Sequence, residues 1–236
     1  MSEWKSKRFW EKASSVPSER GFRVQLDGRP VKTPAKAPLE VPTENLASAI
    51  AAEWDAQEET IDPNSMPCTQ SANAAIDKVS VQREEVAALI AAYGDSDLLC
   101  YRADGPVELV EQQNLAWNPL LNWTDSVLNA PLSSLSGVIH VPQASNSLAT
   151  LRAEVRAQDN FALTALHDLV SLSGSLIIGL AALRDFQPIK TLWSLSRIDE
   201  DWQIAQWGED EEATATASRK KAAFLHAKRF FDLSRS

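Results

Sequence analysis

The N-terminal part of the chain has the alternating hydrophobic pattern of β-strands. Along residues 22–26, Phe-Arg-Val-Gln-Leu, apolar and polar side chains alternate, which is the period of a half-buried strand. Asp27-Gly28 then precedes a second extended run that contains Pro30. Asp-Gly between two such runs favours a tight hairpin, because glycine adopts a positive φ at no steric cost. We therefore expect residues 8–42 to be β-rich, with Gly28 as a structural turn residue and Pro30 at a strand edge.

From residue 43 onward the apolar positions follow the period of a helix. Thr43 can cap a helix on which Leu46, Ile50 and Trp54 share one face, so Trp54 is predicted to be a structural, core-facing residue. The same period predicts helices over residues 80–93, 106–128, 146–172, 174–183 and 188–207, and a last one near the C-terminus. Pro119 is expected to kink or restart the helix in which it falls. Residues 61–70 are predicted to form a loop, and residues 138–141 are a candidate short strand.

These patterns predict an α+β fold in two parts. Residues 1–79 are expected to form a small β-rich N-terminal domain with one helix. Residues 80–236 are expected to form a helical C-terminal domain. Its apolar stripes account for about six helices.

The charge distribution narrows the choice of partner. The formal net charge of −9 argues against nucleic acid, because phosphate binding needs a cationic face. Residues 199–212 carry seven acids and no base, whereas residues 213–236 carry six bases and one acid. The most apolar uncharged window, residues 169–183, is too short to span a bilayer. The chain start has no signal-peptide core, so we expect a protein of a reducing compartment that is not inserted in a membrane.

Candidate chemistry is sparse. The two cysteines, Cys68 and Cys100, cannot make a disulfide scaffold or a four-cysteine zinc site, and they are expected to be buried apolar residues. Only three histidines are present, far apart in sequence, so no metal site is expected. Gly174 and Gly179 have the spacing of a phosphate-binding loop, but the lysine that such a loop requires is missing. They are therefore expected to be structural, permitting close helix packing, and no cofactor and no catalytic set are predicted.

Tryptophans beside acids are the remaining signal. Trp202 follows Asp199-Glu200-Asp201, and Trp207-Gly208 precedes the run from Glu209 to Glu212. Neither acidic run has the alternating ligands of a calcium loop. One interpretation is a core anchor with solvated neighbours, and the other is a partner-binding surface, where aromatic anchors supply energy and acids steer a basic partner. Composition does not choose between these interpretations.

Several stretches, taken in order, resemble the F1-type ATP synthase assembly chaperones that act on the α subunit, a family of mitochondria and alphaproteobacteria. The matching segments are Val-Gln-Leu-Asp-Gly-Arg-Pro-Val-Lys-Thr-Pro at 24–34, Ala-Ala-Glu-Trp-Asp-Ala-Gln at 51–57, Ile-Asp-Pro-Asn-Ser-Met-Pro at 61–67, Asp-Leu-Leu-Cys-Tyr-Arg-Ala at 97–103, Trp-Asn-Pro-Leu-Leu-Asn-Trp at 117–123, Ser-Gly-Ser-Leu at 173–176, Asp-Glu-Asp-Trp-Gln at 199–203 and Trp-Gly-Glu-Asp-Glu-Glu at 207–212.

The resemblance implies a β-rich N-terminal domain followed by an orthogonal α-helical bundle, with no enzymatic activity and no nucleotide requirement. It implies a transient partner, the unassembled α subunit, which is held until the β subunit replaces the chaperone. An acidic position important in the family falls on Glu211. The expected partner-binding residues are Asp199, Trp202, Trp207, Asp210, Glu211 and Glu212. The lack of a targeting extension favours the cytoplasm of a bacterium, or the mitochondrial matrix for a processed eukaryotic chain.

Two other hypotheses remain open. The chain could be an enzyme with a cryptic carboxylate or cysteine site in the helical domain, which a polar pocket with a cysteine beside a histidine would favour. It could also be an adaptor that stays in its complex, which stoichiometric presence in the finished assembly would favour.

Overall fold

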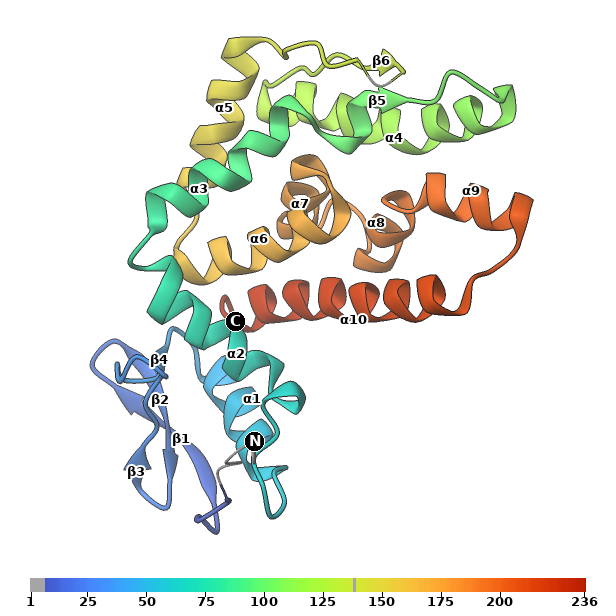
Figure 1. The fold of residues 1–236 in the computed structure, drawn as a ribbon. Helices are drawn as coiled ribbons and strands as arrows, with labels where there is room; N and C mark the ends of the chain where they lie inside the picture. Colours follow the sequence, from blue (N-terminus) through green and yellow to red (C-terminus); the bar gives the residue numbers. More distant parts are fainter. Residues whose placement is uncertain (1–6, 138) are drawn as a thin grey trace. The chain divides into compact units, whose positions relative to one another are not determined.

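The computed structural model describes residues 7–137 and 139–236, and it divides into two compact units (Figure 1). The first unit is the chain up to Arg83 together with residues 160–165 and 229–236. The second unit is made of residues 84–159 and 166–228. The sequence predicts a boundary between residues 79 and 80. The first unit ends four residues later, and it also includes the two later segments.

The first unit contains a small antiparallel sheet. Its strands are β1 (Ala13–Ser18), β2 (Gly21–Leu26), β3 (Arg29–Pro30) and β4 (Glu40–Val41), and β2 pairs with each of the others. In register, Ala13 lies opposite Leu26, Leu26 opposite Arg29, and Phe22 opposite Val41. Asp27 and Gly28 alone connect β2 to β3, with φ of 48° and 79°. Two consecutive positive φ values are those of a type I′ turn, so the hairpin predicted from Asp-Gly is confirmed.

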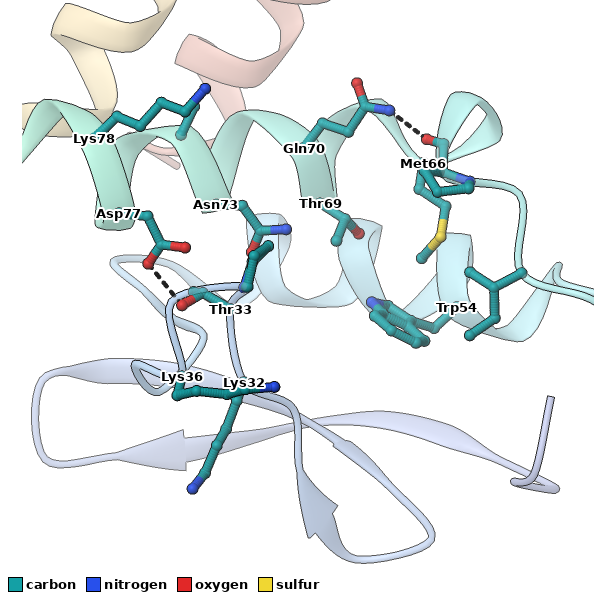
Figure 2. Close-up of a pocket in the computed structure, with 14 residues that line it drawn as sticks. Lys32, Thr33, Lys36, Trp54, Met66, Thr69, Gln70, Asn73, Asp77 and Lys78 are labelled. Carbon is teal, nitrogen blue, oxygen red and sulfur yellow. Dashed lines mark hydrogen bonds between the residues drawn. The ribbon is translucent and has the colours of Figure 1, made fainter. Parts of the chain in front are cut away.

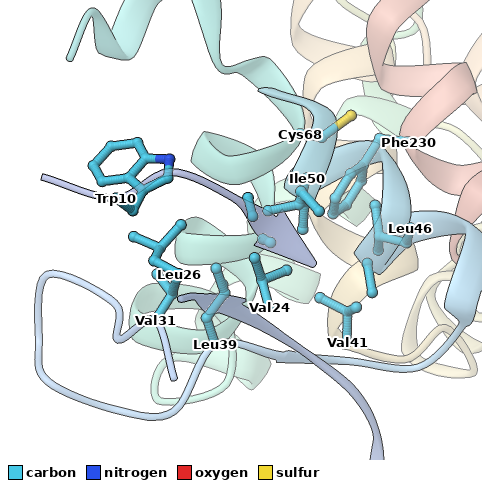
Figure 3. Packing of buried hydrophobic residues seen from close by; sticks show 14 of the residues in the cluster. Trp10, Val24, Leu26, Val31, Leu39, Val41, Leu46, Ile50, Cys68 and Phe230 are labelled. Atoms are coloured by element: carbon cyan, nitrogen blue, oxygen red, sulfur yellow. The ribbon is translucent and has the colours of Figure 1, made fainter. Parts of the chain in front are cut away.

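Helix α1 (Glu44–Asp55) covers this sheet. The Thr43 hydroxyl accepts a hydrogen bond from the Leu46 amide at 3.2 Å, which is the predicted cap. Leu46 and Ile50 are fully buried. They join strand residues and Phe230 in one apolar cluster (Figure 3). The two apolar periods in the sequence selected Val24, Leu26, Leu46 and Ile50 of this cluster, but not its alanines Ala13, Ala47 and Ala51.

The segment after α1 differs from its prediction as a loop. A 3₁₀ turn at Pro63–Ser65 leads into helix α2 (Pro67–Ala74), and a π-helical turn follows at Ala75–Val79. The Glu53 carboxylate, from α1, accepts hydrogen bonds from the amides of Cys68 (2.6 Å) and Thr69 (2.8 Å) and from the Thr69 hydroxyl (2.8 Å). A helix start leaves such amides unpaired and carries a partial positive charge. A side chain of the preceding helix thus caps α2.

Helices make up most of the second unit. They are α3 (Arg83–Ala92), α4 (Val107–Leu128), α5 (Ser145–Arg156), α6 (Asn160–Ser173), α7 (Leu176–Leu183), α8 (Ile189–Leu195), α9 (Ile198–Trp207) and α10 (Glu211–Leu233). The first residues of α6, up to 165, and the last residues of α10, from 229, belong to the first unit. 3₁₀ turns at Tyr93–Asp95 and Leu98–Cys100 precede a short parallel pair of strands, β5 (Tyr101–Arg102) and β6 (Leu135–Ser136).

Helix α4 continues through the exposed Pro119 without a restart. Two predictions about helix bounds are wrong. The helix predicted over residues 146–172 is two helices separated by residues 157–159, and the one predicted over 188–207 is interrupted at Ser196-Arg197. The strand predicted at 138–141 begins at residue 138, which lies outside the described residues, and residues 139–141 are not extended into a strand.

Asp97 joins the start of α7 to the turn before β5. Its carboxylate is fully buried and accepts hydrogen bonds from the Ser175 hydroxyl (2.7 Å) and from the amides of Leu99 and Ile177 (3.0 Å each). Burial raises the pKa of Asp97 to about 6, in opposition to these hydrogen bonds. Gly174, next to Ser175, has φ of +72°, and its carbonyl oxygen accepts a hydrogen bond from the Leu98 amide at 3.2 Å.

Glycine is required at positions 174 and 179 for different reasons. A Cβ on Gly174 would meet only Leu98 at 3.9 Å, so its left-handed φ, and not close packing, requires glycine. A Cβ on Gly179 would lie 2.6 Å from Val170 Cγ2 and 2.9 Å from Leu166 Cδ1 of α6. Close approach of the two helices therefore depends on Gly179, as predicted.

Substitution Gly179→Ala is expected to lower the free energy of unfolding by about 1–3 kcal/mol, because the new methyl group overlaps Val170. Urea denaturation measures this loss. In a Val170→Ala background the nearer of the two obstructing atoms is gone and only Leu166 Cδ1 remains, so the same change should cost less. An equal cost in both backgrounds would contradict the packing explanation.

The fold is therefore α+β, with a small N-terminal sheet and a mainly helical remainder, as predicted. Among the described residues, no helix has the length and apolar character needed to cross a membrane.

Candidate functional site

Helix α9 places three of the six predicted partner-binding residues along one groove. Asp199 in its first turn, Trp202 in its middle and Trp207 at its end line this groove. The opposite wall comes from the start of α4 and from the β5 segment that includes Tyr101 and Arg102. The groove has a volume of about 430 Å³. Trp207 is 81% exposed at its end, so it is available to a partner and does not anchor the core.

A buried amide holds Asp199 in the groove wall. Gln113 of α4 is 1% exposed, and its Nε2 donates to Asp199 Oδ1 at 2.6 Å. The Gln113 Oε1 accepts the Ala103 amide at 2.8 Å, and its carbonyl accepts Arg102 Nη1 at 2.7 Å. One glutamine thus connects α4, α9 and the segment after β5. Asp199 therefore has a positioning role in addition to lining the groove.

Arg102 forms the base of the same network. It is 5% exposed, its Nη2 donates to Asn118 Oδ1 at 3.1 Å, and its guanidinium lies 5.0 Å above the Trp117 ring. Burial lowers the pKa of Arg102, while the charge of Asp199 acts in the opposite direction. A charge in this position is compensated chiefly by carbonyl and amide oxygens and by an aromatic face. The cation therefore supports the groove from beneath.

The corner between α9 and α10 presents the other acidic residues. Gly208 ends α9 with φ of +90°, and a Cβ there would meet nothing within 4 Å, so backbone conformation alone favours glycine. The Asp210 carboxylate accepts the Ala213 amide at 2.8 Å and so caps α10. Glu211 and Glu212 occupy the first turn of α10 and are exposed. Acids at a helix start are stabilised by the helix dipole.

A second hollow lies beside this corner. Asp210 and Glu212 line it with Arg197, Thr216 and Lys220, and its volume is about 410 Å³. Glu211 lines neither hollow. The structure thus divides the predicted set: one group lies along the groove, another beside the second hollow, and Glu211 at the start of α10. All six belong to α9 or the start of α10, so they occupy one end of the second unit.

The residues assigned structural roles lie elsewhere. Gly28 occupies the β2–β3 turn and Gly174 the turn before α7. Trp54 is half-buried, packs edge-to-face on Trp10 with ring centroids 5.2 Å apart, and contacts the apolar cluster of the first unit. Its other face lines a large pocket, so it is less enclosed than a core residue.

Sequence reasoning did not single out Gln113 or Glu53 as organising residues. Glu53 and Arg102 stand within the segments at 51–57 and 97–103 that carry the family resemblance, and this was the available signal for both. Gln113 lies in no such segment. In the parts of the chain that are described, no group of three or more histidine, cysteine or acidic residues is arranged to hold a metal ion.

Comparison with known proteins supplies the family. The model of the family described as "ATP12 chaperone protein" matches residues 7–125. The mitochondrial protein atp12 of Schizosaccharomyces pombe is 28% identical over 219 residues, which cover 88% of this chain and 75% of the relative. The crystal structure of Atp12 from Paracoccus denitrificans is 52% identical, with a TM-score of 0.96 over 99% of this chain and all of that chain.

A second bacterial structure agrees with the first. The Atu1473 protein of Agrobacterium tumefaciens is 37% identical, with a TM-score of 0.89 over 95% of this chain and 84% of that one. Similarity of this extent, in both sequence and backbone, includes both units. The chain therefore belongs to the ATP12 chaperone family.

Proposed function

We propose that this chain is an assembly chaperone for the F1 head of ATP synthase. In this proposal it binds the unassembled α subunit, keeps it from aggregating, and gives way to the β subunit. It does so without a nucleotide, a cofactor or a covalent step. Membership of the ATP12 chaperone family is the observation that carries the proposal. An unpaired subunit of a ring exposes an apolar interface of a size that promotes aggregation, so covering it is a task that binding alone performs.

The end of the second unit formed by α9 and the start of α10 supplies a suitable surface. Trp207 is an exposed aromatic side chain of the kind that contributes most to protein interfaces. The surrounding acids, Asp210, Glu211 and Glu212, would steer a basic patch of the partner toward it. Because these acids are solvent-exposed, their attraction is moderate and is screened by salt. A grip of this type is consistent with a partner that must later be released.

Charge reversal at Glu211 tests this grip. Glu211→Lys is expected to weaken capture of the isolated α subunit about tenfold at low salt, corresponding to about 1.4 kcal/mol. Its effect on folding should stay below about 1 kcal/mol, since it changes only a helix-dipole interaction. Capture on immobilised α subunit, measured as a Kd by interferometry, reports the change.

Glu44→Lys is the matched control, since Glu44 is likewise the exposed first residue of a helix, in the first unit. It should leave the Kd unchanged. Equal weakening by both variants, or none by Glu211→Lys in a folded protein, would remove α10 from the binding surface.

The enzyme alternative receives little support from the cysteines. Burial raises the pKa of Cys68 to about 12, assisted by Glu53, and burial likewise raises the pKa of Cys100 to about 12. A nucleophilic cysteine needs a thiolate near neutral pH. We therefore expect neither thiol to react with Ellman's reagent at pH 7.5 in the folded protein, and both to react in 6 M guanidinium chloride. Rapid labelling of one thiol in the folded protein would reopen the enzyme hypothesis.

We propose that the chain acts in the cytoplasm of a bacterium, because the similar proteins from Paracoccus and Agrobacterium are bacterial. For a processed eukaryotic chain it would be the mitochondrial matrix, since the fission yeast relative is mitochondrial.

A further inference from the structure

The first unit contains a pocket that the proposed grip does not use. Its volume is about 700 Å³, and it lies between the segment after β3, the end of α1, and α2 with the π-helical turn (Figure 2). Trp54, Ile61, Pro63 and Met66 give it an apolar side. Lys32 and Lys36 from the segment after β3, and Lys78 from the π-helical turn, also line it (Figure 2).

The pocket wall is held in place by Asp77. Its Oδ1 accepts the Thr33 hydroxyl at 2.6 Å, and its Oδ2 accepts the Ala35 amide at 3.0 Å. The Thr33 hydroxyl in turn accepts the Ala37 amide at 3.1 Å. Among the described residues that line the pocket, Asp77 is the one acid, against three lysines. The lining residues therefore carry a net positive charge.

Two buried polar atoms at the pocket lack partners. Among the described residues, neither the Trp54 indole Nε1 nor the Asn73 Oδ1 has a hydrogen-bond partner, although both atoms are buried. In Figure 2 the indole nitrogen is turned toward the side of the pocket where Thr69 and Asn73 lie. A buried donor and a buried acceptor without partners each cost free energy. A ligand that offered one carbonyl and one N–H to this wall would recover both hydrogen bonds.

Met66 allows the wall to adjust to such a ligand. Its side chain lies against the Trp54 ring in Figure 2 and is 2% exposed. An unbranched thioether repacks at low cost, and surfaces that accommodate varied apolar side chains use methionine for this reason. Movement of Met66 would uncover the indole edge for a bulky apolar group.

From these features we infer that the pocket binds an extended acidic peptide segment that carries one bulky apolar side chain. The apolar side chain enters between Trp54 and Met66. The peptide backbone pairs with the Trp54 N–H and the Asn73 carbonyl. Acidic side chains on either side meet Lys36 and Lys78. The inference rests on the proposed function for the source of the segment, which is an acidic stretch of the protein that this chaperone holds.

Peptide binding tests the inference directly. The probe is a fluorescein-labelled octapeptide with one leucine between flanking glutamates, measured by anisotropy at 50 mM salt with the full chain. Lys36→Glu combined with Lys78→Glu should weaken its binding at least about tenfold, because two attractive charges become repulsive. Lys12→Glu combined with Lys190→Glu makes the same charge change at exposed positions outside the pocket. This control should alter the Kd by less than about twofold.

A second variant isolates the indole N–H. Trp54→Phe keeps a ring on the apolar cluster and removes only the donor and part of the ring area. It should weaken the probe about three- to tenfold, a range expected for one hydrogen bond with some lost contact. Its urea midpoint, measured alongside, separates lost binding from lost folding.

Several outcomes would overturn the inference. These are no binding to the wild-type protein, equal binding of a peptide with lysines in place of glutamates, equal binding with a serine in place of the leucine, or equal weakening by the control. Self-association of the wild-type protein that the Lys36/Lys78 variant abolishes would assign the pocket to a second copy of this chain instead. If the probe binds as expected but the α subunit is not captured, the pocket stands and the proposed function fails. If the α subunit is captured but the probe does not bind, the proposed function stands and the inference about the pocket fails.

Discussion

Asp97→Asn is expected to lower the free energy of unfolding at pH 7 by about 2–4 kcal/mol, since it turns an amide nitrogen toward backbone donors. The carboxylate has 0% exposure and accepts hydrogen bonds from Ser175, Leu99 and Ile177. Only one oxygen remains in the variant, so at least one buried amide loses its acceptor. Urea denaturation at pH 7 measures the loss. Asp104→Asn, at an exposed position, is the control and should change little.

The same substitution has a predictable pH signature. Burial raises the pKa of Asp97 to about 6, from an ordinary value of 3.8. Between these two values the folded protein binds more protons than the unfolded chain, so this group makes the wild type less stable as pH rises through the window. The stability gap between wild type and Asp97→Asn should therefore be larger at pH 4 than at pH 7, by up to about 3 kcal/mol. A gap that is constant or narrows on acidification would mean that the folded-state pKa is not raised.

Glu53→Ala is the second change with a large expected effect. It removes the acceptor of the Cys68 amide, the Thr69 amide and the Thr69 hydroxyl. Cys68 is 1% and Thr69 6% exposed, so water does not readily replace the carboxylate. We expect a loss of about 3–4 kcal/mol, combining unpaired buried donors with a lost helix-dipole interaction.

Hydrogen exchange gives this prediction a local readout. In Glu53→Ala the amides of α2 should exchange faster than those of β2, because the cap acts on α2 first. Glu58→Ala, a change at an exposed acid beyond α1, is the control and should leave both unaltered. A Glu53→Ala protein with wild-type stability would mean that the carboxylate merely accompanies α2 and does not stabilise it.

The elements predicted well from sequence are those whose signals are local. Asp27-Gly28 specifies its turn through two φ values, and Thr43 caps α1 through a residue three positions away. The apolar periods of β2 and α1 each identify one buried face. None of these predictions depends on a distant residue, which is why the first 55 residues of the sequence are the most readable part of the fold.

The elements predicted wrongly depend on distant residues, or on helix ends that no glycine or proline marks in the sequence. The first turn of helix α2 lies within residues 61–70, which are predicted to form a loop. Proline is, however, well suited to the first turn of a helix, and the cap comes from Glu53, fourteen positions before Pro67. The break after α5 falls on Ala157-Gln158-Asp159, which contains neither glycine nor proline. The packing of the helices determines where such a chain turns, and this position cannot be read from the spacing of apolar residues.

The candidate site was readable only in part. Charge blocks beside tryptophans identified residues of α9 and the start of α10, because charge and aromatic content are properties of composition. The groove itself depends on Gln113, which lies 86 residues before its partner Asp199 and has no distinguishing neighbours in sequence. The sequence likewise gave no sign that Glu211 would lie outside both hollows while Asp210 caps the helix.

The central proposal is that this chain protects an unassembled α subunit by surface contact alone. Dilution of denatured α subunit into buffer, followed by light scattering with and without an equimolar amount of this chain, tests it most directly. The account predicts that scattering is suppressed without any nucleotide, and that Glu211→Lys suppresses it less than Glu44→Lys does. Scattering that rises equally fast in the presence and absence of the chain would contradict the account.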